Sequence, residues 1–327
     1  MKIYPMYRLL RNVVSLFFFA ALVTSVPVNA TTYPLPNPED SVIGEVQYVT
    51  SHYEDTLLAI GRKYGVGYEE MAAANPGIDP WLPGEGTRIV IPTQYVLPNV
   101  PRTGIVVNLP EHRIYYFPNP KKGEQPTVQT FPVSIGRMNW KTPLGITRVV
   151  SKQENPAWYP PESVRREHAA DGDPLPAVVP AGKDNPLGEF AMRLGIPGGS
   201  YLIHGTNKPE GIGMGDTHGC IRMYPEDIEF FFKEVTVGTP VLIINQPFKM
   251  GWSAGKLFME IHKPLLDTEA EDDTDLTNLT RLVVSATSQR SADINWSEAE
   301  RLFQIPSGIP AEVPLKAASE EKNLSQD

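Results

Sequence analysis

The chain has 327 residues and a formal net charge of −9. This acidic balance argues against nucleic acid or an anionic membrane surface as the partner of the protein. Thirty-three prolines and 26 glycines favour short strands and many turns over long helices, in a chain long enough for two modest domains.

The first thirty residues have the pattern of an export signal. Basic residues begin the segment, residues 13–26 are mostly apolar, and Ala30 ends a small-residue motif that resembles a cleavage site. We expect a signal peptide at residues 1–30 and a mature chain without stable membrane insertion. A membrane anchor is the alternative interpretation, but the apolar stretch is short for a span and Pro27 follows it.

Residues 44–92 predict a small α+β unit. Apolar periodicity and capping residues indicate a strand, two helices and a strand, at residues 47–49, 57–64, 68–74 and 88–92. This βααβ order resembles the LysM module, on residues that include Tyr48, Thr56, Gly65, Asn75 and Ile89. The resemblance implies binding to the N-acetylglucosamine-containing backbone of peptidoglycan. The alternative is a packing unit of the same fold that does not bind sugar.

From Thr103 onward the pattern becomes strongly β, after a linker at residues 95–102. Apolar runs predict strands at residues 105–109, 113–117, 127–134, 144–150, 201–203 and 241–244. Pro225 opens a helix whose stripe is expected in the core: Ile228, Phe231, Phe232 and Val235. Residues 153–185 are long for a loop in a compact domain, so we expect a functional flap there. The sequence predicts a mainly β domain with short helices at residues 102–246.

The C-terminal segment, residues 247–327, has weaker patterns and no functional interpretation. Residues 252–265 favour one more hairpin packed on the domain. Residues 267–275 contain six acidic side chains and are typical of a solvated linker, and residues 281–303 favour helix.

Cys220 is the only cysteine of the sequence, so it has no partner within the chain for a disulfide. Glycines are dense around it, which is typical of a loop where the backbone comes close to another group. A thiol in such a loop is a candidate nucleophile, and a buried structural thiol is the alternative. Two imidazoles could take its proton: His218, two residues before it, and His204, at the end of a predicted strand.

Two further groups near the thiol suit acyl-transfer chemistry. Backbone N–H groups around Gly219 and Cys220 could form an oxyanion hole, because glycine allows close approach. Arg222 could hold a substrate carboxylate in a bidentate contact, or be an ordinary surface arginine.

The motifs His204-Gly205-Thr206-Asn207 and Thr217-His218-Gly219-Cys220-Ile221-Arg222 resemble the signature of L,D-transpeptidases with a YkuD-type catalytic domain. The order of signal peptide, LysM-like unit, catalytic domain and tail is similar to the periplasmic enterobacterial ErfK/YbiS/YcfS/YnhG group. The resemblance implies a periplasmic enzyme without cofactor or metal. It assigns Cys220 as the nucleophile, His204 as proton donor and acceptor, and an orienting role to His218. Substrate contacts are expected from Thr217, Asn207 and Arg222.

The reaction implied by the resemblance is a double acyl transfer on peptidoglycan stem peptides. The acceptor is the terminal lysine of the outer-membrane (Braun) lipoprotein or the diaminopimelate of a second stem, which gives a 3–3 crosslink. Hydrolysis of the lipoprotein link is a further possibility. Two hypotheses of other classes stay open: a zinc hydrolase with His204, His218 and Cys220 as ligands, and a non-catalytic cell-wall binding protein.

Overall fold

The computed structural model describes residues 31–265 and 276–316, apart from residues 36, 38, 138 and 289. The expected signal peptide and acidic linker therefore lie outside the described residues. Within the described part, no helix combines the length and the apolar character needed to cross a membrane.

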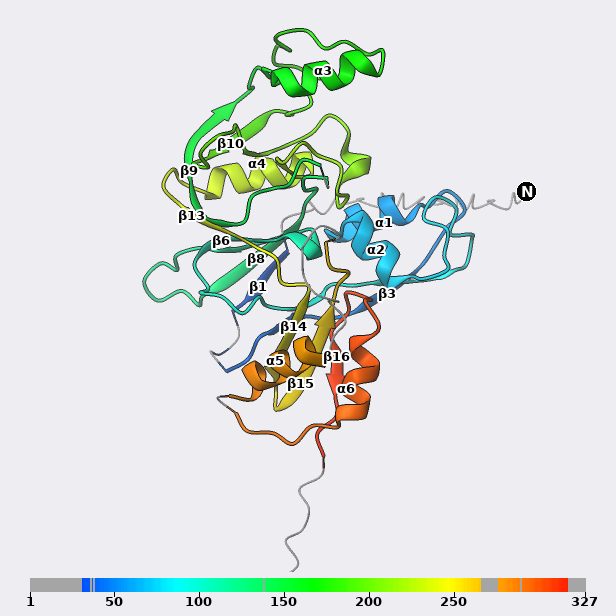
Figure 1. Ribbon diagram of the computed structural model, residues 1–327. Coiled ribbons are helices and arrows are strands. Elements are labelled where there is room, and N and C mark those ends of the chain that lie inside the picture. Colours follow the sequence, from blue (N-terminus) through cyan, green and yellow to red (C-terminus); the bar gives the residue numbers. More distant parts are fainter. Residues whose placement is uncertain are drawn as a thin grey trace, which may run out of the picture.

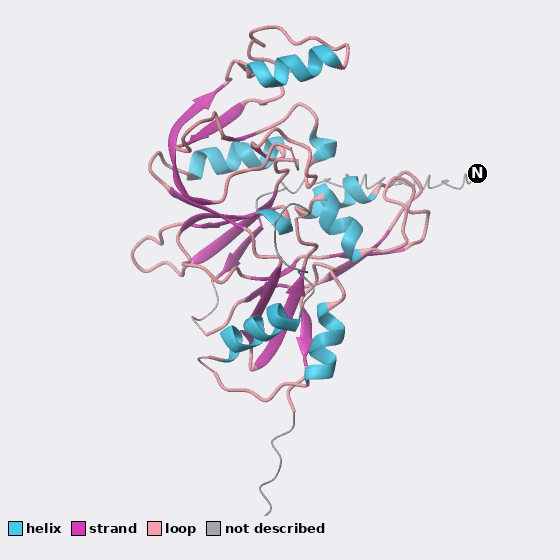
Figure 2. Ribbon diagram, viewed as in Figure 1, coloured by secondary structure: helices cyan, strands magenta, loops and turns pink. Residues whose placement is uncertain are grey.

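A curved, nine-stranded sheet forms the centre of the described structure (Figures 1 and 2). Its strands are β1 Thr31–Pro34, β6 Gly104–Asn108, β7 Arg113–Phe117, β8 Thr127–Pro132, β9 Gly145–Glu154, β10 Phe190–Leu194, β11 Leu202–His204, β12 Ile221–Arg222 and β13 Pro240–Ile244. They lie in the order β1-β8-β7-β6-β13-β9-β10-β11-β12. Most neighbours are antiparallel, but β13 runs parallel to β6 and β12 runs parallel to β11. The protein is mainly β with short helices, as the sequence predicts.

Helix α4 (Pro225–Glu234) packs on the part of the sheet that carries β10 to β12. The helix buries Asp227, and its predicted apolar residues Ile228, Phe231 and Phe232 are buried too, as is Val235 at its C-cap. They share one core with Ile203 and Ile221, which are almost completely buried. Burial of these apolar side chains in the shared core stabilises the last two strands of the sheet.

The N-terminal unit has the strand, helix, helix and strand that the sequence predicts: β3 Gln47–Thr50, α1 Leu57–Tyr64, α2 Tyr68–Ala74 and β4 Arg88–Ile91. Thr56 caps α1 by accepting the N–H of Ala59, and Gly65 ends the helix with a left-handed φ of 66°. Strands β3 and β4 pair antiparallel. We call residues 47–91 the N-terminal module.

This module is attached to the nine-stranded sheet, to the loop before Cys220 and to helix α4. Glu70 of α2 forms a buried ion pair with Arg113 of β7, at 2.7 Å. The N–H of Tyr68 donates to the carbonyl of Ile212 at 3.0 Å. Arg62 of α1 holds both carboxylate oxygens of Glu226, at 2.8 and 2.9 Å.

Residues 248–261 and 276–313, apart from residue 289, form a second small unit with its own core. Its elements are β14 Phe248–Ser253, β15 Lys256–Ile261, α5 Leu276–Thr287, α6 Trp296–Phe303 and β16 Ala311–Val313. A hairpin is present but begins and ends four residues before the predicted 252–265, and the predicted helical stretch 281–303 is two helices. Asn295 ends the break between them by capping α6. The first residues of the expected linker 95–102 belong to a strand, β5 Gln94–Val96, which pairs antiparallel with β2 Val42–Gly44.

The long segment between β9 and β10, residues 155–189, is called the flap here. It contains a helix that the sequence did not reveal, α3 Glu162–Ala170, which Figure 1 shows at one end of the molecule. Asn185 closes the base of the flap by donating to the carbonyl of Pro156 at 2.8 Å. The remaining elements are two 3₁₀ turns, η1 Leu109–Glu111 and η2 Pro209–Gly211.

Candidate active site

Parallel pairing of β11 with β12 brings the two motifs together. Ile203 lies opposite Ile221, and His204 lies opposite Arg222. Because side chains alternate along a strand, the residues on either side of Ile203 and Ile221 share the opposite face of the sheet. Cys220 directly precedes β12, so the pairing brings it to the same end of the sheet as His204, although sixteen residues separate them in the sequence.

The imidazole of His204 is buried and held in one tautomer. Its Nδ1 lies 2.6 Å from the carbonyl oxygen of Gly205. A carbonyl only accepts, so Nδ1 carries the proton and Nε2 of the neutral ring is left as the acceptor. Burial lowers the pKa of His204 to about 4, against the opposing effect of the Gly205 hydrogen bond. The ring is therefore neutral near pH 7 and can accept a proton.

The thiol of Cys220 is partly buried and protonated at rest. Its Sγ lies 3.6 Å from the carbonyl oxygen of Ser200, a weak donor contact of the thiol. Burial raises the pKa of Cys220, and a backbone contact with Leu202 opposes this shift in part. A raised thiol pKa and a lowered imidazole pKa describe two groups that are both neutral at rest rather than a preformed thiolate and imidazolium.

Two threonine hydroxyls hold consecutive carbonyls around the thiol. Thr217 donates to the carbonyl of Cys220 at 2.6 Å, and Thr142 donates to the carbonyl of Gly219 at 3.0 Å. Gly219 has a φ of 96°, a backbone conformation that favours glycine. Thr217 thus supports the backbone of the loop, while the exposed Asn207 lies on the other motif.

His218 faces the flap. Its Nε2 lies 3.2 Å from Oε2 of Glu167, on α3, and 3.3 Å from the guanidinium of Arg137. Arg137 and Glu167 also form an ion pair with each other. The ring of Trp140 packs edge-on against His218, with centroids 5.2 Å apart. Burial lowers the pKa of His218, with Glu167 acting in the opposite direction.

The guanidinium of Arg222 contacts both carboxylate oxygens of Asp216. Its side chain is only 17% exposed, and its charge helps to lower the pKa of His204. A substrate carboxylate would have to share Arg222 with Asp216 or displace it.

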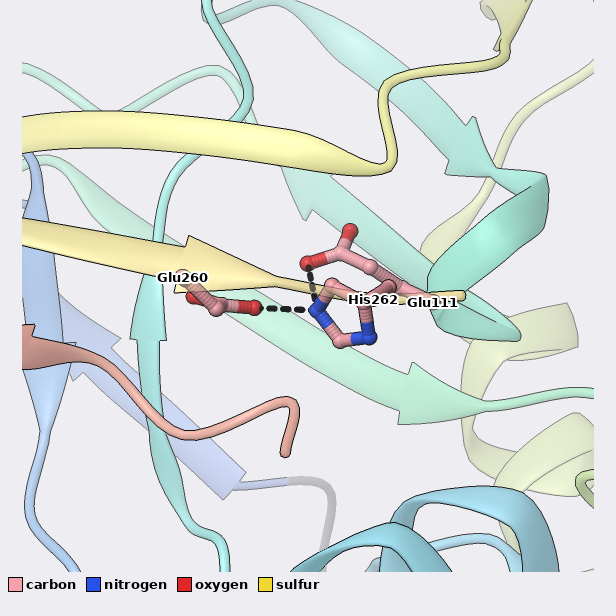
Figure 3. A group of neighbouring side chains, drawn as sticks. All are labelled: Glu111, Glu260 and His262. Carbon is pink, nitrogen blue, oxygen red and sulfur yellow. Dashed lines mark hydrogen bonds and ion pairs between the residues drawn. The ribbon is translucent and has the colours of Figure 1, made fainter. Parts of the chain in front are cut away.

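One group of side chains in the described residues has the spacing of a metal site, and it is remote from the candidate nucleophile in the fold. Glu111, Glu260 and His262 place ligand atoms within 4.8 Å of one another, and Figure 3 shows the imidazole between the two carboxylates. However, the ammonium of Lys249 lies 2.8 Å from Glu260 and also pairs with Glu111. The carboxylates already have a cation, so the cluster is best described as a buried ion network. His204, His218 and Cys220 do not form such a group among the described residues.

Sequence reasoning did not single out four side chains that contact the predicted site. Thr142 is followed by Pro-Leu-Gly, a short sequence that indicates a turn and is a usable local signal. The sequence gives no such signal for Arg137, Glu167 or Asp216. Arg137 and Glu167 contact His218 from distant segments, and Asp216 is recognisable only through its contact with Arg222.

A profile of the L,D-transpeptidase catalytic domain, YkuD, matches residues 102–243. The probable L,D-transpeptidase YcfS of Escherichia coli K12 is 39% identical over 300 residues, which cover 90% of this chain and 92% of that protein. The probable L,D-transpeptidase ErfK/SrfK of the same strain is 40% identical over 313 residues, covering 93% and 97%.

Among solved structures, L,D-transpeptidase 3 from Mycobacterium tuberculosis aligns with 48% of this chain and 67% of its own. The sequence identity is 20% and the TM-score is 0.32.

Proposed function

This chain belongs to the L,D-transpeptidases with a YkuD-type catalytic domain, and we propose that Cys220 is the nucleophile of its reaction, with His204 as the base. The observation that supports the proposal is the parallel register of β11 and β12, which pairs His204 with Arg222 and so brings Cys220, two residues earlier, to the same end of the sheet. The fixed tautomer of His204, with Nε2 as acceptor, supports it.

The proposed donor substrate is a peptidoglycan tetrapeptide stem. His204 takes the thiol proton as Sγ attacks the carbonyl of the third residue of the stem, usually meso-diaminopimelate. The tetrahedral oxyanion collapses, His204 gives the proton to the leaving amine of D-alanine, and a thioester remains. General-base catalysis suits a neutral pair, because the proton moves only when the substrate is in place.

The second half of the reaction resolves the thioester with an amine. His204 removes a proton from the acceptor amine as it attacks, and Cys220 leaves as the thiol. The acceptor is the terminal lysine of an outer-membrane (Braun) lipoprotein or the diaminopimelate of a second stem. Oxyanion donation comes from the backbone around Gly219, and substrate contacts come from Arg222, Asn207 and the flap.

We also propose that the N-terminal module is LysM-like and binds glycan. Two of its loops adjoin, because the N–H of Leu57 donates to the carbonyl of Pro80 at 2.8 Å. These loops carry exposed side chains that suit stacking on a sugar: Tyr53 at 83% and Trp81 at 55% exposure. Together with the export signal expected at residues 1–30, glycan binding fits an enzyme of the periplasm.

The test is turnover of purified disaccharide-tetrapeptide, followed by mass spectrometry. The wild-type protein should release D-alanine, show a thioester adduct on Cys220, and form 3–3 dimers or, with an added peptide that ends in lysine, the corresponding conjugate. Cys220→Ala should abolish all of these, while Tyr53→Ala should keep them on soluble substrate but weaken binding to intact sacculi. Full activity of Cys220→Ala would refute the proposal, and zinc-dependent hydrolysis would favour the metalloenzyme.

A further inference from the structure

Thr142 lies at the centre of a buried contact between two chain segments. Its Oγ1 accepts the N–H of Gly136 at 3.0 Å and donates to the carbonyl of Gly219 at 3.0 Å. The side chain is 4% exposed, so water has little access to compete for these groups. The hydroxyl therefore acts both as acceptor and as donor, and these two hydrogen bonds connect the turn at residues 136–142 to Gly219.

This turn has little freedom to move. The N–H of Arg137 donates to the carbonyl of Thr217, and the N–H of Thr217 donates to the carbonyl of Ile135, both at 3.0 Å. A Cβ on Gly136 would lie 2.1 Å from the carbonyl oxygen of Trp140 and 2.9 Å from the Cα of Gly219. The turn is consequently packed so closely against the nucleophile loop, residues 217–220, that a side chain at position 136 would not fit.

The contact fixes the direction of one peptide group. In a planar trans peptide the C=O and the following N–H point in opposite directions. Thr142 holds the carbonyl of Gly219, so the N–H of Cys220 is aimed away from Thr142. The hydroxyl of Thr217 fixes the next carbonyl, that of Cys220, so the peptide groups on both sides of the nucleophile are held.

We propose that Thr142 is a positioning residue for the transpeptidation. It orients the Gly219–Cys220 peptide so that the N–H of Cys220 donates to the oxyanion that forms when Sγ attacks the stem carbonyl. The inference rests on the proposed role of Cys220. A nucleophile's own N–H commonly supplies such a donor in acyl-transfer enzymes, and removal of one donor lowers turnover by about 10²–10³-fold.

The experiment separates oxyanion chemistry from thiol reactivity. Thr142→Val keeps the shape of the side chain but removes the hydroxyl, and Thr142→Ser keeps the hydroxyl. Two rates are measured for each: formation of the thioester from tetrapeptide, which passes through an oxyanion, and alkylation of Cys220 by iodoacetamide, which is a direct displacement and forms none. We expect Thr142→Val to acylate roughly 10- to 100-fold more slowly, because the donor is misdirected rather than deleted. Its alkylation rate should equal that of the wild type, and Thr142→Ser should acylate at close to the wild-type rate.

Two outcomes would overturn the role of Thr142: acylation of Thr142→Val at the wild-type rate, or an equal loss of acylation and alkylation, which would indicate general disruption of the loop. If Thr142→Val does not fold, as judged by thermal unfolding, Thr142→Ala takes its place, since it adds no methyl group at the hydroxyl position. Cys220→Ala is measured in parallel. Activity in Cys220→Ala contradicts the proposed function itself, whereas an inactive Cys220→Ala beside a fully active Thr142→Val contradicts only the positioning role.

Discussion

Oε2 of Glu167, on the flap helix α3, lies 3.2 Å from Nε2 of His218, two residues before the candidate nucleophile. Arg137 pairs with the same carboxylate and lies 3.3 Å from Nε2 of His218. One acidic side chain, that of Glu167, thus connects helix α3 of the flap to the loop that carries Cys220.

Glu167→Gln should loosen the flap without altering the thiol. We expect KM for the tetrapeptide to rise roughly two- to fivefold, because the partners are partly exposed and such contacts are weak. The value of kcat should stay near that of the wild type. Steady-state kinetics measure both constants, and Glu162→Gln, an exposed change on the same helix, is the matched control. A large fall in kcat with unchanged KM would indicate that Glu167 acts on the chemistry instead.

The pH dependence should reflect a neutral resting pair. The pKa of His204 is lowered to about 4, so the ring is neutral above this pH, and kcat/KM should be level from pH 5 to 7 and fall as the pH drops through 4. The pKa of Cys220 is raised, so its thiolate forms only at a higher pH than the thiolate of an ordinary cysteine. Iodoacetamide labelling of Cys220 should therefore rise at higher pH than labelling of free cysteine. A fast labelling plateau below pH 7 is the signature of an ion pair and would contradict this prediction.

Glu70→Gln should weaken the attachment of the N-terminal module. Glu70 and Arg113 form an ion pair that is buried on both sides, with side chains 6% and 1% exposed. Removing the carboxylate leaves a buried guanidinium without a counter-charge, which costs about 3–5 kcal/mol. Chemical denaturation gives the free energy of unfolding. Glu312→Gln, which breaks the exposed pair with Lys256, should cost less than about 1 kcal/mol.

Lys249→Met should turn the buried ion network into a cation site. Without the ammonium, Glu111, Glu260 and His262 retain the spacing of metal ligands, and zinc accepts carboxylate and imidazole. We expect the variant to be destabilised by about 3–5 kcal/mol and to recover roughly 2.7 kcal/mol with zinc at a hundred times its Kd. Thermal unfolding with zinc and with chelator measures this. The wild type and Lys256→Met should respond to neither, and a wild-type protein stabilised by zinc would show that Lys249 does not occupy the site.

The sequence predictions that the structure confirms depend on interactions between residues close together in the sequence. The helices of the N-terminal module depend on the cap at Thr56 and the stop at Gly65, both within a few residues of the helix they define. The stripe of α4 is likewise a pattern within ten residues. Such elements are readable because the interactions that stabilise them lie close together in the sequence.

Elements that depend on distant partners were missed. Strand β1 lies in a segment with repeated prolines and is a strand because it pairs with β8, about a hundred residues later. Strand β16 pairs with β15 across the two C-terminal helices. The same reason applies at the site: the sequence around Thr142 indicates a turn, but its contact with Gly219, 77 residues away, depends on the tertiary fold.

Burial of the resting thiol has a further consequence, for its survival. Peroxide and other oxidants attack the thiolate, so the rate of sulfenic acid formation follows the fraction of thiol that is ionised. Cys220 has a raised pKa and, as the only cysteine of the chain, no resolving thiol that could rescue an oxidised form. Keeping the proton until an acyl group arrives therefore limits irreversible oxidation of the residue on which activity is proposed to depend.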